Sequence, residues 1–344
     1  MNSHFLHQPE RASGPRPLPE PGLGIAVINE REGLGDGFYK SPLLRALKRA
    51  YPAEKITWVV SEGDSPYRLT MAEIVRPYLA RVLADAHLRR PTPGAIRRLR
   101  QLPPSSLVID QRTSSVAVMA AKQMLRTKLY QAASRGYLFC SRQLQGPRPM
   151  HKLTQLMALL EAVTGCPVDG SGEIDLPTDA EEQAAVLLPD GPRYVGLAPG
   201  TSTRIRCWPL DQFVGLAKWA QTRGWHPVLL LGPNEQDLRE PLRSALPGAS
   251  FPTSRNARIL AEVHLSLAIG RRLSASVTMD TGLGHLLAAA GTPLVSLFGP
   301  TNPKRWAPRG RRRILVISSR RYGGREMERI PLTAVSSAVE GLMA

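Results

Sequence analysis

A segment near the C-terminal end of the chain carries polar side chains where a buried strand ends and a helix is expected to begin. Residues 279–285 place Asp280, Thr281, Gly282 and His285 at this turn. Unpaired N–H groups and the positive end of the helix dipole favour an anion there, and glycine lets it approach the backbone. The segment is suited to phosphate, although a helix cap at Asp280 or Thr281 explains the same residues equally well.

A second segment supplies positive charge and hydroxyl groups after another predicted strand. Residues 198–206 contain Thr201 and Ser202, followed by Arg204 and Arg206. Arginine at this position could neutralise a departing phosphate group. Trp208 and the proline after it more simply begin the next helix.

Two further carboxylates follow predicted strands. Glu235 comes after residues 227–232, where an acidic residue can bind a ribose hydroxyl in nucleotide-binding folds, although a solvated loop carboxylate is the commoner case. Asp36 stands in the glycine loop 33–37 after the first strand and suits a general base facing a cleft. A single aspartate in a glycine loop is weak support by itself.

The elements that must position these residues alternate between short apolar runs and helical patterns. Such alternation favours parallel sheets with helices on their faces. A helix is expected from Pro42, with the proline near its first turn, and further helices over 210–222 and 285–290. The predicted strands are 25–28, 56–60, 107–110, 194–198, 227–232, 276–280 and 293–299.

The length of 344 residues suggests two domains. Residues 165–192 are rich in proline and glycine, and strand–helix alternation restarts after them. We expect an irregular proline-rich tail over 1–21, an N-terminal domain over 22–175, a second domain over 176–330, and a C-terminal helix over 331–344. The fold class is α/β, with two Rossmann-like domains and a central cleft where strand ends meet.

Absent motifs narrow the choice of enzyme class. Phe38 takes the place of the third glycine in G-x-G-x-x-G, which weakens a dinucleotide-binding hypothesis. The chain contains no G-x-x-x-x-G-K-[ST] of phosphate-loop ATPases and no G-x-S-x-G of serine hydrolases. No D-x-D pair is available to hold a divalent ion on a diphosphate, so protein cations and N–H groups would have to stabilise it. Three separated cysteines support neither disulfides nor zinc. We therefore predict no metal and no cofactor.

Composition and charge limit the partners. Hydrophobic residues make up 42% of the chain and charged residues 21%, which excludes a wholly disordered protein. The net charge of +17 favours polyanions, although a solvated arginine surface explains it as well. No apolar run approaches the roughly 20 residues of a membrane-spanning helix, and no secretory signal begins the chain. The sequence predicts a cytoplasmic protein.

Taken in order, several segments resemble glycosyltransferase family 9, the ADP-heptose:lipopolysaccharide heptosyltransferases. The first combines Gly35-Asp36 with Pro42–Leu47 and Tyr51-Pro52. The resemblance covers about residues 24–340. Its later blocks are Ala198–Thr201 with Arg206–Pro209, then Leu230–Gly232, Asp280–Leu286 and Leu297–Pro303.

This resemblance implies a GT-B fold and metal-independent transfer of a heptose from ADP-heptose with inversion. The acceptor would be an anionic glycolipid of the lipopolysaccharide core type, which the enzyme would bind at the inner face of the cytoplasmic membrane. Asp36 would be the base, and Arg206 would steady the diphosphate. The residues that would bind the donor are Thr201, Ser202, Glu235, Asp280, Thr281, Gly282 and His285.

Departures from the family pattern leave alternatives open. Members that transfer the first heptose often carry histidine where this chain has Tyr39. An arginine-rich stretch, residues 89–100, suits either an anionic lipid acceptor or a solvated surface. A family 9 transferase with another nucleotide sugar and a nucleotide-sugar epimerase on the same fold remain open. The non-enzyme alternative, a basic nucleic-acid-binding protein, lacks a recognition motif and aromatic stacking residues, so no nucleic acid is expected.

Overall fold

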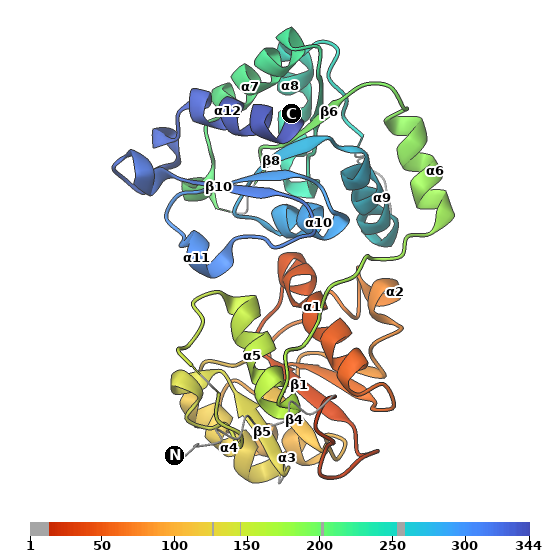
Figure 1. The fold of residues 1–344 in the computed structure, drawn as a ribbon, viewed down its shortest axis with the longest axis vertical. Coiled ribbons are helices and arrows are strands. Elements are labelled where there is room, and N and C mark those ends of the chain that lie inside the picture. The colour runs from red at the N-terminus through yellow and green to blue at the C-terminus, as the bar shows by residue number, and fades with distance from the viewer. Residues whose placement is uncertain (1–13, 126, 145, 201–202, 253–258) are drawn as a thin grey trace, which may run out of the picture.

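The computed structural model describes residues 14–125, 127–144, 146–200, 203–252 and 259–344, which form two five-stranded parallel sheets (Figure 1). The strand order of the N-terminal sheet is β3-β2-β1-β4-β5, and that of the C-terminal sheet is β10-β9-β8-β6-β7. The prediction of an α/β chain with two Rossmann-like domains is confirmed. The N-terminal strands are β1 (Ile25–Asn29), β2 (Ile56–Val60), β3 (Arg81–Leu83), β4 (Leu107–Asp110) and β5 (Leu129–Ala132). The C-terminal strands are β6 (Tyr194–Ala198), β7 (His226–Leu229), β8 (Ala275–Met279), β9 (Leu294–Phe298) and β10 (Ile314–Ser318).

In each sheet the strand order reverses beside the domain's first strand. β1 lies between β2 and β4, and β6 lies between β7 and β8. Connections leave in opposite directions at such a point, which opens a crevice at the carboxyl ends of the strands. The segments that follow β1, β6, β7 and β8 are those with the predicted site residues.

Helices cover the faces of both sheets (Figure 1). Those of the N-terminal half are α1 (Leu34–Ala50), α2 (Ala72–Val75), α3 (Pro93–Arg100), α4 (Ser115–Leu125) and α5 (Lys152–Thr164). Those of the C-terminal half are α6 (Thr178–Leu187), α7 (Leu210–Thr222), α8 (Arg239–Ala245), α9 (Ile259–Arg272), α10 (Gly282–Ala290), α11 (Pro303–Trp306) and α12 (Leu332–Met343). Short 3₁₀ helices cover Ser134–Tyr137, Arg204–Arg206, Pro233–Leu238, Ser319–Tyr322 and Met327–Arg329.

The first helix begins earlier than the sequence predicts. α1 starts at Leu34, so Asp36 lies in its first turn and Pro42 lies inside it. The prediction of a glycine loop over 33–37 with Pro42 near the helix start is therefore wrong. Pro42 has no N–H for the carbonyl of Phe38, but the Ser41 hydroxyl donates a hydrogen bond of 3.0 Å to that carbonyl. The helix continues because a side chain satisfies the oxygen that proline leaves free.

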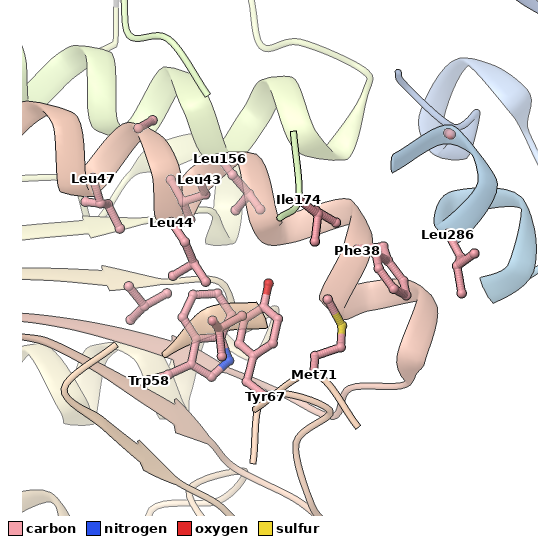
Figure 2. Close-up of a cluster of buried hydrophobic side chains, with 14 of the residues drawn as sticks. Phe38, Leu43, Leu44, Leu47, Trp58, Tyr67, Met71, Leu156, Ile174 and Leu286 are labelled. Carbon is pink, nitrogen blue, oxygen red and sulfur yellow. The ribbon is translucent and has the colours of Figure 1, made fainter. Parts of the chain in front are cut away.

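Buried apolar side chains join the helices to the strands and also cross between the two halves. Leu43, Leu44 and Trp58 are fully buried between α1 and β2. At the start of α1, Phe38 lies across from Leu286 of α10 (Figure 2). The same hydrophobic cluster thus contains residues of both halves. Since apolar burial is the main favourable term in folding, this contact ties α1 to α10.

The connection between the halves runs from the end of α5 into α6. The predicted boundary at residues 175 and 176 falls in this connection. α6 packs against α9, and Arg271 pairs with Glu181 at 2.6 Å. The C-terminal helix expected over 331–344 is observed as α12, which packs against α7 and β8. No helix in the described part of the chain has the length and apolar character required to cross a membrane.

Candidate functional site

The site is built where the N-terminal turns of α1 and α10 meet. A Cβ atom added to Gly35 would lie 2.7 Å from the Cα of Gly282, closer than real Cβ contacts allow. The two helices therefore touch through their backbones at these glycines. This contact brings the Gly35-Asp36 motif of one half against the Asp280–His285 motif of the other.

Asp36 lies half-buried in the first turn of α1. Its Oδ2 accepts a hydrogen bond of 2.9 Å from the N–H of Gly33, which caps the helix. An acidic side chain in the first turn also complements the helix dipole. Among the described residues no donor is bonded to Oδ1, so one oxygen of the carboxylate can accept a proton.

A cavity of about 250 Å³ opens beside this contact at the carboxyl ends of β6, β7 and β8. Its walls bring together five residues that the sequence analysis selected from three separate segments of the chain. The residues that line it are Gly200, Arg206, Leu230, Gly232, Glu235, Asp280, Thr281, Gly282 and Leu283.

Arg206 gives this cavity its positive charge. The guanidinium Nη2 donates to the Thr203 hydroxyl at 2.9 Å, and Nη1 donates to the Asp280 carbonyl at 3.4 Å. The Asp280 carboxylate lies 3.8 Å from Nη1, and 30% of the Arg206 side chain is exposed. These contacts hold the guanidinium in place and leave part of it open to an anionic ligand.

The N-terminus of α10 borders the same cavity. The Thr281 hydroxyl accepts a hydrogen bond of 3.4 Å from the N–H of Gly284, so Thr281 does cap the helix. Thr281, Gly282 and Leu283 also line the cavity. The capping role and the phosphate-binding role are therefore compatible, because the positive end of the helix lies next to the cavity.

Glu235 packs against the glycines that follow β6 and β7. A Cβ atom on Gly200 would lie 2.3 Å from the Glu235 carboxyl carbon, so any other residue at position 200 would displace the carboxylate from this place. Burial, together with the charge of Asp237, raises the pKa of Glu235, and a hydrogen bond from the backbone of Gly232 opposes that rise. The carboxylate is placed to accept hydrogen bonds from a ligand hydroxyl.

His285 does not line this cavity. Its ring lies 6.0 Å from that of Tyr39, and Tyr39 lies 6.2 Å from Trp306. It borders a second cavity of about 410 Å³ between α1, α5 and α10. Burial lowers the pKa of His285 to about 4, so the imidazole is neutral near pH 7. The predicted residues Thr201 and Ser202 lie outside the described residues.

A buried network under α1 was missed by the sequence analysis. Glu32 accepts hydrogen bonds from Lys40 at 2.7 Å, from the Trp58 indole at 2.9 Å and from Ser65 at 2.9 Å. Satisfying every oxygen makes a buried carboxylate tolerable. The network fixes the start of α1 on β2, and no local sequence pattern points to it.

Within the ranges that the structure describes, no three His, Cys, Asp or Glu side chains gather as a metal site.

Comparisons with known proteins identify the family. The model of glycosyltransferase family 9 (heptosyltransferase) matches residues 107–330. Lipopolysaccharide heptosyltransferase 1 of Pseudomonas aeruginosa is 30% identical over 80% of this chain and 79% of its own length.

Solved structures share the fold at low sequence identity. A family 9 glycosyltransferase of Veillonella parvula covers 94% of this chain and 98% of its own, with a TM-score of 0.71 and 19% identity. The E. coli heptosyltransferase WaaC with ADP covers 92% of this chain and 99% of its own, with a TM-score of 0.66 and 19% identity. The chain therefore belongs to glycosyltransferase family 9 and is a glycosyltransferase with a two-domain GT-B fold.

Proposed function

We propose that the protein transfers a heptose from ADP-heptose to an acceptor of the lipopolysaccharide core type. The observation that supports this most strongly is the contact between Gly35 and Gly282, which brings the first turn of α1, with Asp36, against the start of α10 and beside the Arg206 cavity. Relatives named lipopolysaccharide heptosyltransferases support the sugar and the acceptor class. The solved relatives with ADP and with ADP-2-deoxy-2-fluoro heptose support the donor.

The donor diphosphate would lie between Arg206 and the N-terminus of α10. Both supply positive charge, and a guanidinium can bind two phosphate oxygens at once. Glu235 would accept a hydrogen bond from a ribose hydroxyl. Thr201 and Ser202 are proposed to contact phosphate, and Asp280, Thr281 and Gly282 to hold the diphosphate and sugar. His285, which lies beside Tyr39 outside the Arg206 cavity, is proposed to contact the sugar from that side.

The reaction we propose is a single displacement. The acceptor hydroxyl attacks the anomeric carbon while the bond from that carbon to the diphosphate oxygen breaks, and ADP leaves with the electron pair. Asp36 takes the hydroxyl proton. Because nucleophile and leaving group occupy opposite faces of the sugar, the anomeric configuration inverts. Arg206 and the α10 N-terminus stabilise the negative charge that develops on ADP, so no metal is required.

We expect Gly35→Ala to lower the rate of glycosyl transfer about 10- to 100-fold, because a displacement near 1 Å at reacting groups can cost two orders of magnitude. The added methyl group would push the starts of α1 and α10 apart. Gly33→Ala is the matched control, since its Cβ would meet only Asp36 at an ordinary 3.7 Å. Equal steady-state kinetics for the two variants would show that the helix contact does not matter.

The acceptor side is proposed to bind an anionic glycolipid at the inner face of the cytoplasmic membrane, with the enzyme itself cytoplasmic. The net charge of +17 favours an anionic surface. Arg97, Arg98 and Arg100 of α3 are candidates for this contact.

Calorimetric titration with ADP, GDP and UDP, each with magnesium and with EDTA, is the first test. We expect ADP to bind preferentially and with unchanged affinity in EDTA. A transfer assay with ADP-heptose would then give an inverted anomeric linkage by NMR. Preference for another nucleotide would contradict the heptose donor, and loss of transfer in EDTA would contradict metal independence.

Three outcomes would favour the alternatives. Binding of a different nucleotide sugar would indicate another family 9 transferase activity. Turnover of the donor without any acceptor would indicate an epimerase on the same fold. Steeply salt-dependent DNA binding without ADP binding would instead support the nucleic-acid-binding hypothesis.

A further inference from the structure

Three aromatic rings from the two halves pack together beside the contact of α1 with α10. Tyr39 belongs to α1, His285 to α10 and Trp306 to α11. The centroid of the Tyr39 ring lies 6.0 Å from that of His285 and 6.2 Å from that of Trp306, which it meets edge to face at 70°. Aromatic rings at about 4.5–7 Å attract one another beyond the burial of their area. Through Tyr39 the N-terminal half therefore contacts two elements of the C-terminal half.

No hydrogen bond orients the His285 imidazole. Across the described ranges, no donor or acceptor is bonded to either nitrogen of this ring, so contacts such as that with Tyr39 must hold it. Tyr39 and His285 both border the cavity of about 410 Å³, and so do Ala288 and Ala289, which follow on α10. Small side chains and open space on that side would let the imidazole turn. Packing against Tyr39 is therefore the contact that restricts its orientation.

The first two turns of α1 carry both Tyr39 and the proposed base. Asp36 and Tyr39 are three residues apart, so their side chains are neighbours on the helix surface. A Cβ atom on Gly35 would lie 3.6 Å from Cδ2 of His285, so the imidazole lies against the same part of α1. The place of Asp36 and the orientation of His285 are thus both set by the start of α1.

The orientation of a neutral imidazole decides what it can bind. Burial is the main cause that lowers the pKa of His285 to about 4; the charge of His151 adds to this effect, and the charge of Asp280 opposes it. A neutral imidazole has one N–H donor and one nitrogen acceptor. A sugar hydroxyl meets the suitable nitrogen only when the ring is turned correctly. A residue that fixes the ring would therefore affect transfer without touching the substrate.

We propose that Tyr39 is a positioning residue: its ring, packed against Trp306, fixes the His285 imidazole in the orientation that contacts the donor sugar. This inference rests on the proposed transferase function. Because Tyr39 and Asp36 share one helix, the same side chain would align the sugar, held by the C-terminal half, with the base of the N-terminal half.

Transfer kinetics at about pH 8 test the orientation apart from the charge, since a histidine with a pKa at or below the usual value of about 6.5 is neutral there. Tyr39→Ala should lower kcat about 10-fold or more, because misplaced groups react slowly, while ADP affinity changes less than about 2-fold. Tyr39→Phe keeps the ring and should restore kcat to within about 2-fold of wild type. The matched control is Tyr78→Ala, since Tyr78 is also half-buried against the same hydrophobic cluster. It should lose stability without losing kcat.

A double-mutant cycle decides whether Tyr39 acts through His285. If it does, adding Tyr39→Ala to His285→Gln should reduce kcat little further, because residues that act as a unit are not additive. Losses that multiply would show independent roles and overturn the inference. A Tyr39→Phe variant as slow as Tyr39→Ala would also overturn it. Trp306→Leu, which removes the other neighbour of Tyr39, is a second variant and should show the same dependence on His285.

NMR titration of the His285 ring reports on the contact without any turnover. We expect a pKa of about 4 in wild type, and a similar pKa in Tyr39→Phe. In Tyr39→Ala the pKa should rise toward the usual value of about 6.5, because water then reaches the ring. An unchanged pKa in Tyr39→Ala would show that Tyr39 does not hold the imidazole and would overturn the inference. Failure of wild-type protein to bind ADP would instead contradict the proposed function, while the titration would still report on the contact.

Discussion

Asp36→Asn is expected to reduce the turnover number for glycosyl transfer about 10²- to 10⁴-fold, the usual contribution of a general base. The amide cannot take the acceptor proton, although it occupies the same place in the first turn of α1. ADP affinity should stay within about 2-fold, because Asp36 lies outside the cavity that contains Arg206. Steady-state transfer rates and ADP calorimetry measure the two quantities separately.

The capping role of Asp36 requires a second variant. Asp36→Ala loses the hydrogen bond from the Gly33 N–H and should lower the free energy of unfolding by about 1 kcal/mol. An asparagine side chain would keep an oxygen for that bond, so Asp36→Asn should retain most of the thermal stability. If Asp36→Asn transferred at nearly the wild-type rate, the assignment of Asp36 as the base would be wrong, whatever its effect on stability.

Arg206→Gln should reduce the turnover number about 10²- to 10³-fold, as expected when one donor to a developing negative charge is removed. Glutamine can still hydrogen-bond, but it supplies no positive charge to the leaving diphosphate. Arg206→Lys should recover part of the rate, because it restores the charge without the planar fork. Single-turnover rates with saturating donor would isolate the chemical step from binding.

The Arg206 variants need a control for the structural contact that Arg206 makes. The guanidinium bonds the Asp280 carbonyl at 3.4 Å, so loss of Arg206 also removes a link between two loops of the cavity. Thermal unfolding and ADP affinity should therefore be measured for each variant. If Arg206→Gln raised only the donor KM and left turnover intact, Arg206 would bind ground state and transition state equally, and its catalytic role would be refuted.

Local patterns predicted most elements of the fold correctly. The apolar runs at 25–28, 56–60, 107–110 and 194–198 are strands, because a strand buried on both faces reads as a continuous apolar run. The helix predicted over 210–222 is α7, with the same ends. Trp208 and Pro209 were predicted to begin this helix; Pro209 is its N-cap, and Trp208 is buried just before it.

The start of α1 shows where local rules failed. Glycine and proline usually mark loops and helix starts, so Gly33, Gly35 and Pro42 predicted a late beginning. The helix nevertheless includes Gly35 and Pro42, because a bare backbone is needed against Gly282 and the Ser41 hydroxyl replaces the missing N–H. Both reasons are contacts with other groups, the Gly282 backbone and the Ser41 hydroxyl, and the helix propensities of single residues do not describe such contacts.

The sequence by itself determined the fold class, the family and the individual segments that carry charge after strands. It did so because burial patterns and motif spacing are local properties of the chain. Only the tertiary structure brought Arg206, Glu235 and Asp280 around one cavity and placed His285 beside Tyr39. These proximities depend on how the two sheets are held together through α1 and α10, and that long-range packing leaves no periodic signal in the sequence.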